Sequence, residues 1–333
     1  MSDISAFDVF NGDADGICAL HQLRMAEPRQ AHRVTGVKRD IALLQRVPTQ
    51  AEARVTVLDI SLDRNAEPLR RLLHGGAEVD YIDHHAAHQR FHHPRLRLTI
   101  DESPELCTSL LVDQRLQGRY RLWAITAAFG DNLQRVGREL AQQQGLDEAQ
   151  TSALARLGQL LNYNAYGEAV SDLLVPPERL YQVLHGYENP FDFVARAEIY
   201  QKLEQGFVDD ERRLGQLQAL WRGHGAELYL LPGETWARRL CGSLANRLMS
   251  QGQARAIAVV TRRSDGDYLV SLRTSAGINA EALCSRYLGG GGRVAAAGID
   301  RLPLDQLEPF IDAFSRHVAQ GAEVSDSAYA ALR

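Results

Sequence analysis

The stretch that decides the fold is Glu78-Val79-Asp80-Tyr81-Ile82-Asp83-His84-His85. Its first five residues predict a short apolar strand, and the strand breaks directly into one carboxylate and two imidazoles. Carboxylate and imidazole groups are the usual ligands of hard or borderline divalent cations. At the end of a strand they would face the crevice where open α/β sheets bind ligands. Ordinary loop histidines are the alternative that this stretch leaves open by itself.

Another segment shows the same arrangement of an apolar strand that ends in acidic residues. Residues 7–10 predict a strand, and a helix-like apolar pattern follows the loop that comes after it. That loop reads Asn11-Gly12-Asp13-Ala14-Asp15-Gly16. Its two aspartates can turn toward one point, where they would repel each other without a cation between them. A turn that ends in an N-cap is the alternative for this loop.

The same plan continues along the N-terminal half of the chain. Residues 54–58 predict a strand with Asp59 at its end, and residues 96–100 predict another strand. Helical patterns separate the strands. An apolar run before Gly130 is followed by a predicted loop that contains Asp131. Strands that alternate with helices predict an α/β fold with a mostly parallel sheet and helices on both faces. The acidic loops would then meet at one edge of the sheet.

The C-terminal part of the chain predicts a smaller α/β domain, across a cleft from the first. We expect a sheet domain at 1–175, a helical connector at 176–224, the smaller domain at 225–320 and a tail at 321–333. Four consecutive glycines, Gly289–Gly292, would let backbone N–H groups approach a phosphate closely. Arg273 and Arg293 would add guanidinium groups that grip phosphate. A flexible loop is the alternative for the glycine run.

Composition argues against several classes of protein. The 333 residues carry a net charge of −5, whereas proteins that wrap long nucleic acids usually show a strongly basic surface. No apolar run is long enough for a membrane span, and the N-terminus does not read as a signal peptide. The four cysteines are far apart and form no metal-binding spacing. They favour buried thiols in a reducing, cytoplasmic compartment.

In sequence order the motifs form one set. It comprises the Asn11–Gly16 loop, Asp59, Asp83-His84-His85, Asp131 and the stretch Gly290–Gly298. The set resembles the DHH phosphoesterase superfamily, with its oligoribonuclease and RecJ-like phosphodiesterases. The glycine stretch resembles the C-terminal DHH-associated domain of that superfamily. The resemblance covers about residues 7–318, and the ordered set is more specific than any one of its parts.

The resemblance implies a hydrolase that uses one or two Mn²⁺ or Mg²⁺ ions. The implied metal ligands are Asp13, Asp15, Asp59, His84 and Asp131, and Asp59 would bridge the two ions. The implied catalytic group is Asn11, Asp83, His84 and His85, in which Asp83 supports His84 and His85 touches the substrate phosphate. The implied substrate-binding residues of the smaller domain are Arg273, Gly291, Gly292 and Arg293.

Three positions depart from the pattern of the superfamily. Val9 stands where many members carry a histidine, four residues before the first loop aspartate. Asn11 stands where RecJ-type exonucleases use an acidic residue, and an Asn carbonyl is a weaker, neutral ligand. Arg293 stands where histidine is usual, and a guanidinium cannot act as a general acid although it still grips phosphate. One of the two ions is therefore expected to bind loosely or to be absent.

The function expected from this set is hydrolysis of short oligonucleotides or dinucleotides, such as pApA or pGpG, to mononucleotides. A single-strand 5′ exonuclease is an alternative that needs a basic, aromatic-lined channel, which the acidic balance disfavours. Hydrolysis of polyphosphate or of another phosphoester is a further alternative. Loss of turnover through the three departures would instead leave a nucleotide-binding sensor. No long-duplex or membrane partner is expected, and a homodimer stays open.

Overall fold

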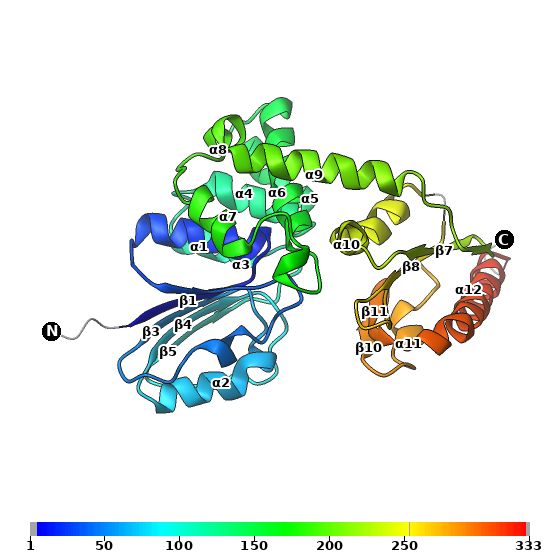
Figure 1. Cartoon of the computed structure of the whole chain (residues 1–333), viewed down its shortest axis with the longest axis horizontal. Coiled ribbons are helices and arrows are strands. Elements are labelled where there is room, and N and C mark those ends of the chain that lie inside the picture. The colour runs from blue at the N-terminus through cyan, green and yellow to red at the C-terminus, as the bar shows by residue number, and fades with distance from the viewer. Residues whose placement is uncertain (1–4, 253, 331–333) are drawn as a thin grey trace. The chain divides into compact units, whose positions relative to one another are not determined.

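The computed structural model describes residues 5–252 and 254–330. The chain divides into two compact units, Met1–Phe207 and Val208–Arg333, which we call the first and the second unit (Figure 1). The division falls inside the segment 176–224 that the sequence assigned to a connector, and α9 (Glu198–Leu214) contributes residues to both units. The domain limits expected from the sequence stay predictions.

A five-stranded sheet lies at the centre of the first unit, in the order β2-β1-β3-β4-β5. Its strands are β1 (Ala6–Phe10), β2 (His32–Val34), β3 (Arg54–Leu58), β4 (Glu78–Asp83) and β5 (Leu96–Ile100). All neighbouring strands are parallel, which confirms the expected sheet. The chain places β2 on one side of β1 and β3 on the other side. A topological switch point therefore lies between β1 and β3.

Helices cover both faces of this sheet. Figure 1 shows α2 on one face and α1, α3 and α4 on the other. The helices that begin in this unit, besides α9, are α1 (Ala14–Ala26), η1 (Leu43–Arg46), α2 (Leu62–His74), α3 (Thr108–Arg115), α4 (Arg121–Gly130), α5 (Gln134–Gln143), α6 (Glu148–Ala165), η2 (Val170–Asp172), α7 (Pro177–Leu184) and α8 (Pro190–Arg196). Val9, Val57 and Tyr81 are fully buried between the helical layers. Burial on both faces explains why these strands read as apolar runs.

The loop after β1 is shorter than the sequence predicted. Helix α1 already begins at Ala14, so Asp15 lies in its first turn and not on an extended loop. Asp13 is the N-cap, and its Oδ1 atom accepts hydrogen bonds from the backbone N–H groups of Asp15 and Gly16 at 3.0 and 3.1 Å. The N-cap interpretation is therefore right for Asp13, but it uses only one of the two carboxylate oxygens.

The second unit contains a six-stranded mixed sheet in the order β10-β11-β9-β8-β7-β6. Its strands are β6 (Trp221–Gly223), β7 (Ala226–Leu231), β8 (Ala256–Arg262), β9 (Tyr268–Thr274), β10 (Gly290–Arg293) and β11 (Ala296–Leu302). Its further helices are α10 (Thr235–Ser250), α11 (Ala280–Cys284), η3 (Leu304–Gln306) and α12 (Leu307–Ala330). The strands β8 and β9 pair antiparallel as the predicted hairpin. Phe310 and Phe314 of α12 are fully buried in the core of this unit.

The glycine run is not the flexible loop that the sequence left open as an alternative. Gly290–Arg293 forms β10, which pairs with β11 at the edge of the sheet. A Cβ atom at Gly290 would lie 1.9 Å from the carbonyl oxygen of Cys284, and one at Gly292 would lie 2.5 Å from Cα of Ala297. No atom lies within 4 Å of a Cβ placed at Gly291. Close packing therefore accounts for two of the glycines, whereas Gly291 lies open on the edge strand.

The last helix continues further than the sequence predicted. Helix α12 extends to Ala330, so the segment 321–333, expected to be a tail, is helical up to that residue. Residues 331–333 lie outside the described part of the chain. None of the helices within the described ranges is long and apolar enough to cross a lipid bilayer.

A pair of histidines, the buried His21 and the half-buried His185, connects α1 to the end of α7. The ring of His21 packs 4.6 Å from that of Trp123, and its Nδ1 atom lies 3.1 Å from Nδ1 of His185. Burial, together with the neighbouring His185, lowers the pKa of His21 from 6.5 to about 3. The folded protein therefore keeps this imidazole neutral in a pH range where the unfolded chain binds a proton.

We predict that the first unit loses stability as the pH falls below the ordinary histidine pKa. The depressed pKa in the folded state means that this loss begins near pH 6.5 and continues to about pH 3, at about 1.4 kcal/mol per pH unit. Chemical unfolding between pH 7 and 5 measures it. His21→Gln should flatten the profile, whereas the exposed His92→Gln should leave it unchanged. Parallel profiles for wild type and His21→Gln would contradict the prediction.

Candidate metal centre

Acidic side chains meet at the carboxyl ends of the parallel strands, beside the switch point between β1 and β3. Asp59 follows β3 directly, Asp13 and Asp15 lie at the start of α1, and Asp131 is the C-cap of α4. His84 follows β4 and reaches the same place. The structure thus brings together all five residues that the resemblance implied as metal ligands. Asp13, Asp15 and Asp59 are almost completely buried.

The imidazole of His84 lies at the middle of this group. Its Nε2 atom lies 3.5 Å from Oδ1 of Asp59, 3.7 Å from Oδ2 of Asp131 and 3.9 Å from Oδ2 of Asp15. Its Nδ1 atom lies 3.0 Å from the carbonyl oxygen of Leu106, which can only accept a hydrogen bond. The proton of the neutral ring is therefore on Nδ1, and the lone pair of Nε2 points toward the carboxylates.

Backbone hydrogen bonds hold Asp15 in place, and the backbone of Asp59 has an unusual conformation. The carboxylate of Asp15 accepts hydrogen bonds from the N–H groups of Thr108 and Ser109, at 2.8 and 2.7 Å, in the first turn of α3. The positive end of that helix stabilises the negative charge. Asp59 has a φ of +58°, a left-handed conformation that non-glycine residues adopt rarely and at some energetic cost. Such backbone conformations are frequent at functional sites.

Burial and mutual repulsion shape the electrostatics of this group. Burial, and then the charges of Asp15 and Asp13, raise the pKa of Asp59 well above its ordinary value. Burial also raises the pKa of Asp131, although Lys38 opposes the shift. A bound cation would relieve this repulsion, and oxygen and imidazole ligands suit Mn²⁺ or Mg²⁺.

The described residues contain two groups of three ligand atoms that all lie within 4.8 Å of one another. One group is Asp59, His84 and His85, and the other is Asp15, His84 and Asp131. The residues present therefore fit a divalent cation, and His84 belongs to both groups. Asp13 belongs to neither.

Sequence reasoning missed Lys38, which lies in the loop after β2. Its Nζ atom forms an ion pair with Oδ2 of Asp13, lies 3.0 Å from Oδ1 of Asn162 and lies 3.6 Å from Oδ1 of Asp131. Burial lowers the pKa of Lys38, but the charge of Asp13 outweighs it, so the pKa is raised well above its ordinary value. Burial likewise raises the pKa of Asp13, and Lys38 turns the net shift downward. The rarity of lysine in this arginine-rich chain was the available signal.

The second histidine of the motif has a different support from the one expected. Nδ1 of His85 lies 2.7 Å from Oδ1 of Asp83, so Asp83 orients His85, whereas Leu106 orients His84. This corrects the expectation that Asp83 supports His84. Burial lowers the pKa of His85, but the hydrogen bond and charge of Asp83 raise it to a net value above the ordinary one. The side chain of His85 is 42% exposed, so it can reach a ligand in solution.

Asn11 takes part in the site through a loop and not as an evident ligand. The side chain is buried, and its Nδ2 atom donates a hydrogen bond to the backbone carbonyl of Lys38 at 3.2 Å. Its Oδ1 atom is buried without a hydrogen-bond partner among the described residues. Asn11 therefore fixes the backbone from which Lys38 extends.

The expected substrate-binding residues lie in the second unit. Arg273 of β9 and Arg293 of β10 both stand directly opposite Ala296 of β11. Residues directly opposite one another on neighbouring antiparallel strands point to the same face of a sheet. The two guanidinium groups therefore leave the same face. Nε of Arg273 donates to Oδ1 of Asn246 at 2.6 Å, which orients its side chain, and Arg293 is exposed.

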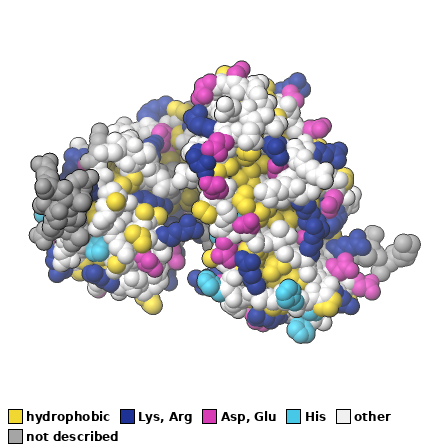
Figure 2. Space-filling model, turned by 180° about the vertical axis from the view of Figure 1, so that it is seen from behind, with side chains coloured by type: hydrophobic (Ala, Val, Ile, Leu, Met, Phe, Trp, Pro, Cys, Tyr) yellow, Lys and Arg dark blue, Asp and Glu magenta, His cyan; other side chains and the backbone are white. Residues whose placement is uncertain are grey.

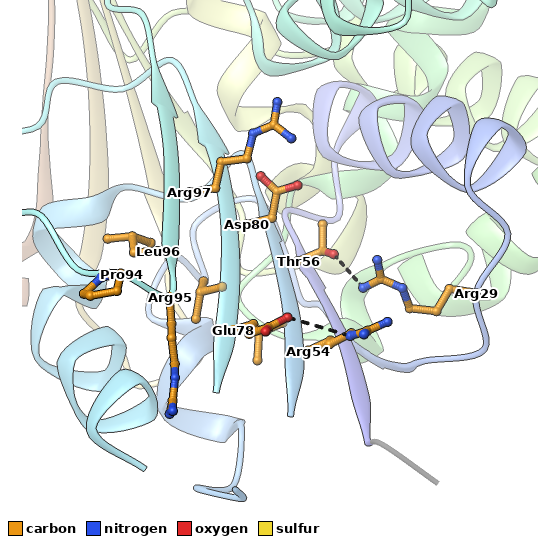
Figure 3. Close-up of a pocket in the computed structure, with 11 residues that line it drawn as sticks. Arg29, Arg54, Thr56, Glu78, Asp80, Pro94, Arg95, Leu96 and Arg97 are labelled. Carbon is orange, nitrogen blue, oxygen red and sulfur yellow. Dashed lines mark hydrogen bonds and ion pairs between the residues drawn. The ribbon is translucent and has the colours of Figure 1, made fainter. Parts of the chain in front are cut away.

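A basic pocket of about 320 Å³ lies elsewhere on the first unit (Figure 3). Its lining includes the residues that begin β3, β4 and β5, namely Arg54, Glu78 and Leu96. Nε of Arg54 lies 3.8 Å from a carboxylate oxygen of Glu78, so acidic groups partly neutralise the pocket. The pocket lies at the amino ends of the strands, roughly 15 Å from their carboxyl ends. The pocket is therefore separate from the acidic cluster, the name we give to Asp13, Asp15, Asp59, Asp131 and the central His84.

Comparison with known proteins shows what the chain is similar to. Residues 225–320 match the DHHA1 domain model. The fold is similar to that of RecJ from Thermus thermophilus, solved in complex with Mn²⁺, with a TM-score of 0.65 and 19% sequence identity. That match covers 95% of this chain and 52% of RecJ, so the chain spans about half the length of that protein.

Two further structures have the same fold. An exonuclease RecJ bound to manganese gives a TM-score of 0.60 at 17% identity, with 95% of this chain and 90% of the other covered. The pGpG-specific phosphodiesterase PggH from Vibrio cholerae gives 0.54 at 13% identity, with 95% and 99% covered. No curated protein sequence matches the chain significantly.

We predict that Mn²⁺ stabilises the first unit, because it binds the folded acidic cluster and relieves its repulsion. At a concentration one hundred times the dissociation constant, the gain is about 2.7 kcal/mol, or roughly 5–10 °C in Tm. Thermal unfolding with and without Mn²⁺ measures the gain. His84→Gln should lose most of the shift, whereas His92→Gln should keep it. An equal shift for wild type and His84→Gln would place the ion elsewhere.

Proposed function

The chain has the DHH-superfamily fold and carries a DHHA1 domain, and from this premise we propose that it is a metal-dependent phosphodiesterase. The proposed substrates are short oligonucleotides or dinucleotides, which it hydrolyses to mononucleotides. The observation that carries the proposal is the position of His84 Nε2, within 3.5–3.9 Å of carboxylate oxygens of Asp59, Asp131 and Asp15. The compartment we propose is the cytoplasm, because the four cysteines are all buried and lie far apart in the sequence.

The cluster is the proposed binding site of the catalytic cation. Asp15, Asp59, His84 and Asp131 supply carboxylate oxygens and one imidazole nitrogen, which are good ligands for Mn²⁺ or Mg²⁺. A divalent cation held there would lower the pKa of a bound water and neutralise charge on a phosphoryl group. The N–H groups of Thr108 and Ser109, which donate to Asp15, and the carbonyl of Leu106, which accepts from His84, fix these ligands before substrate binds.

His85 is the residue that we propose to contact the scissile phosphate. Its Nδ1–H bond is committed to Asp83, so the exposed Nε2 atom faces the substrate side of the ring. Asp83 favours the protonated ring, and a protonated Nε2 donates a hydrogen bond to a phosphoryl oxygen. His85 would thus stabilise negative charge that develops on that oxygen.

The second unit would bind the rest of the substrate. Arg273 and Arg293 present two guanidinium groups on one face of its sheet, and a guanidinium binds phosphate through two parallel hydrogen bonds. Gly291 leaves space beside the edge strand, so a phosphate can approach the backbone closely. These groups suit a terminal phosphate or a second nucleotide.

Charge distribution favours a short substrate. Figure 2 shows basic and acidic side chains interspersed on the visible face. The chain as a whole carries a net charge of −5. A long polyanion requires many phosphate contacts, whereas a dinucleotide requires only a local group of cations.

Replacement of Asp59 tests the catalytic role of the cluster. Asp59→Asn should reduce turnover by roughly three orders of magnitude, because several kcal/mol of charge stabilisation depend on this carboxylate. The fold should persist, since Asn also tolerates a left-handed backbone. The assay uses Mn²⁺ with pApA, pGpG, single-stranded DNA and polyphosphate, and circular dichroism checks the fold. Asp192→Asn on α8 is the control, and near-normal turnover of Asp59→Asn would defeat the assignment.

The same substrate panel tests the substrate class. We expect faster hydrolysis of the dinucleotides than of single-stranded DNA or polyphosphate. A preference for long single-stranded DNA would support a 5′ exonuclease instead. Binding without turnover on every substrate would support a nucleotide sensor.

Replacement of Arg293 tests the role of the second unit. Arg293→Gln should raise KM for a dinucleotide roughly tenfold, because a charge-assisted hydrogen bond to phosphate is lost. The turnover number should change little, since the acidic cluster stays intact. Steady-state kinetics with pGpG give both constants. Arg316→Gln on the exposed side of α12 is the matched control, and equal KM values for both variants would contradict the role.

A further inference from the structure

We propose that the ammonium group of Lys38 takes the place of one cation, so that the site binds a single divalent ion. The ion would use Asp15, Asp59, His84 and Asp131, while Asp13 binds Lys38 and no metal. The proposal rests on the proposed function only for the identity of the metal ligands.

Both carboxylate oxygens of Asp13 already have partners within the protein. Its Oδ1 atom accepts hydrogen bonds from the backbone N–H groups of Asp15 and Gly16, and its Oδ2 atom pairs with Lys38. Neither of the two close groups of ligand atoms includes Asp13, and both include His84. The geometry of the described residues therefore provides for an ion beside His84 and for an ammonium group beside Asp13.

Lys38 fits the position of a cation by its contacts. Its ammonium group donates hydrogen bonds to Oδ2 of Asp13 and Oδ1 of Asn162, and it forms an ion pair with Oδ1 of Asp131. Asp131 is the side chain shared between the two positions, because its Oδ2 atom lies near His84 while its Oδ1 atom lies 3.6 Å from Nζ of Lys38. The carboxylate of Asp131 would thus lie between the ion beside His84 and the ammonium group of Lys38, where its negative charge reduces the repulsion between the two positive charges.

The backbone of Lys38 is held firmly. Its N–H group donates to the carbonyl of Ala165 at 2.8 Å, and its carbonyl accepts from Nδ2 of Asn11 at 3.2 Å. Of the residues before Asp13, Val9 is fully buried in the sheet, and Asn11 uses its Nδ2 atom to hold the carbonyl of Lys38. The ammonium group is therefore a fixed part of the site.

The choice of lysine at this position is chemically specific. The chain has 37 basic residues, and Lys38 and Lys202 are its only lysines. A compact ammonium group approximates the point charge of an ion, whereas a planar guanidinium presents a wide fork. The chain uses arginine at almost all of its basic positions, yet it places one of its two lysines beside Asp13, Asn162 and Asp131.

Counting bound Mn²⁺ tests the proposal without any need for turnover. Electron paramagnetic resonance of the full chain, titrated with Mn²⁺, gives the number of bound ions at saturation. We expect one ion in the wild type, two in Lys38→Met, and one in the charge-retaining control Lys38→Arg. The pair in Lys38→Met should show the exchange-coupled spectrum of neighbouring Mn²⁺ ions. Two ions in the wild type, or one in Lys38→Met, would overturn the proposal.

A second pair of variants leaves Lys38 in place. Asp13→Asn should keep one ion and lose less than tenfold in affinity, whereas Asp15→Asn should lose about 10–100-fold or more, as ligand-shell changes do. An equal loss in both variants would make Asp13 a metal ligand and overturn the proposal.

The number of bound Mn²⁺ ions, together with the hydrolysis assay, also shows whether this proposal or the proposed function has failed. Hydrolysis by a protein with two ions would overturn only the role of Lys38. A count of one without hydrolysis of any tested phosphoester would overturn only the phosphodiesterase.

Discussion

Repulsion between buried carboxylates is the constraint on which the site depends. Asp13, Asp15, Asp59 and Asp131 converge where the parallel strands end, and burial deprives the first three of the water that would screen their charges. Contacts within the protein compensate part of this charge. The first turn of α3 stabilises Asp15, and Lys38 stabilises Asp13 and also lies 3.6 Å from Asp131. The remaining charge gathers around His84 and requires a cation for its neutralisation.

The order of the strands explains why these residues can meet. In the order β2-β1-β3-β4-β5 the chain moves to opposite sides after β1, which opens a crevice at the carboxyl ends of β1 and β3. Asp13 and Asp59 follow these two strands, and His84 follows the next one. Helices α3 and α4 then deliver Thr108 and Asp131 to the same place. The backbone strain at Asp59 lies at the centre of this arrangement.

A lysine in a metal site changes how the site responds to its surroundings. An ion exchanges with solvent, so its occupancy depends on metal concentration, whereas the ammonium of Lys38 is a covalent part of the chain. The loop that carries Lys38 is also tied to Ala165 and Asn11, so the position of this charge depends on α6 and on the turn after β1. Preorganised charge of this kind needs no reorganisation at the moment of reaction.

Much of this architecture could be predicted from the sequence because it depends on local patterns. Apolar runs that end in Asp59 or in Asp83-His84-His85 identify strands, and their alternation with helices predicts a parallel sheet, which the structure confirms. The DHHA1 match at 225–320 agrees with the second domain expected from the glycine motif. The sequence did not reveal that the glycine run forms an edge strand, because the clash that a Cβ would make at Gly290 comes from a separate helix.

The sequence by itself determined the strands that lead into the site, β1, β3 and β4, and which side chains could bind a cation. Only the tertiary structure decided that Asp83 supports His85, that Leu106 orients His84, and that Lys38 joins the cluster. The physical reason is that each of these contacts depends on distances of a few ångströms. Lys38 and Asp131 are more than ninety residues apart in the chain, and no local pattern records that the fold brings them together.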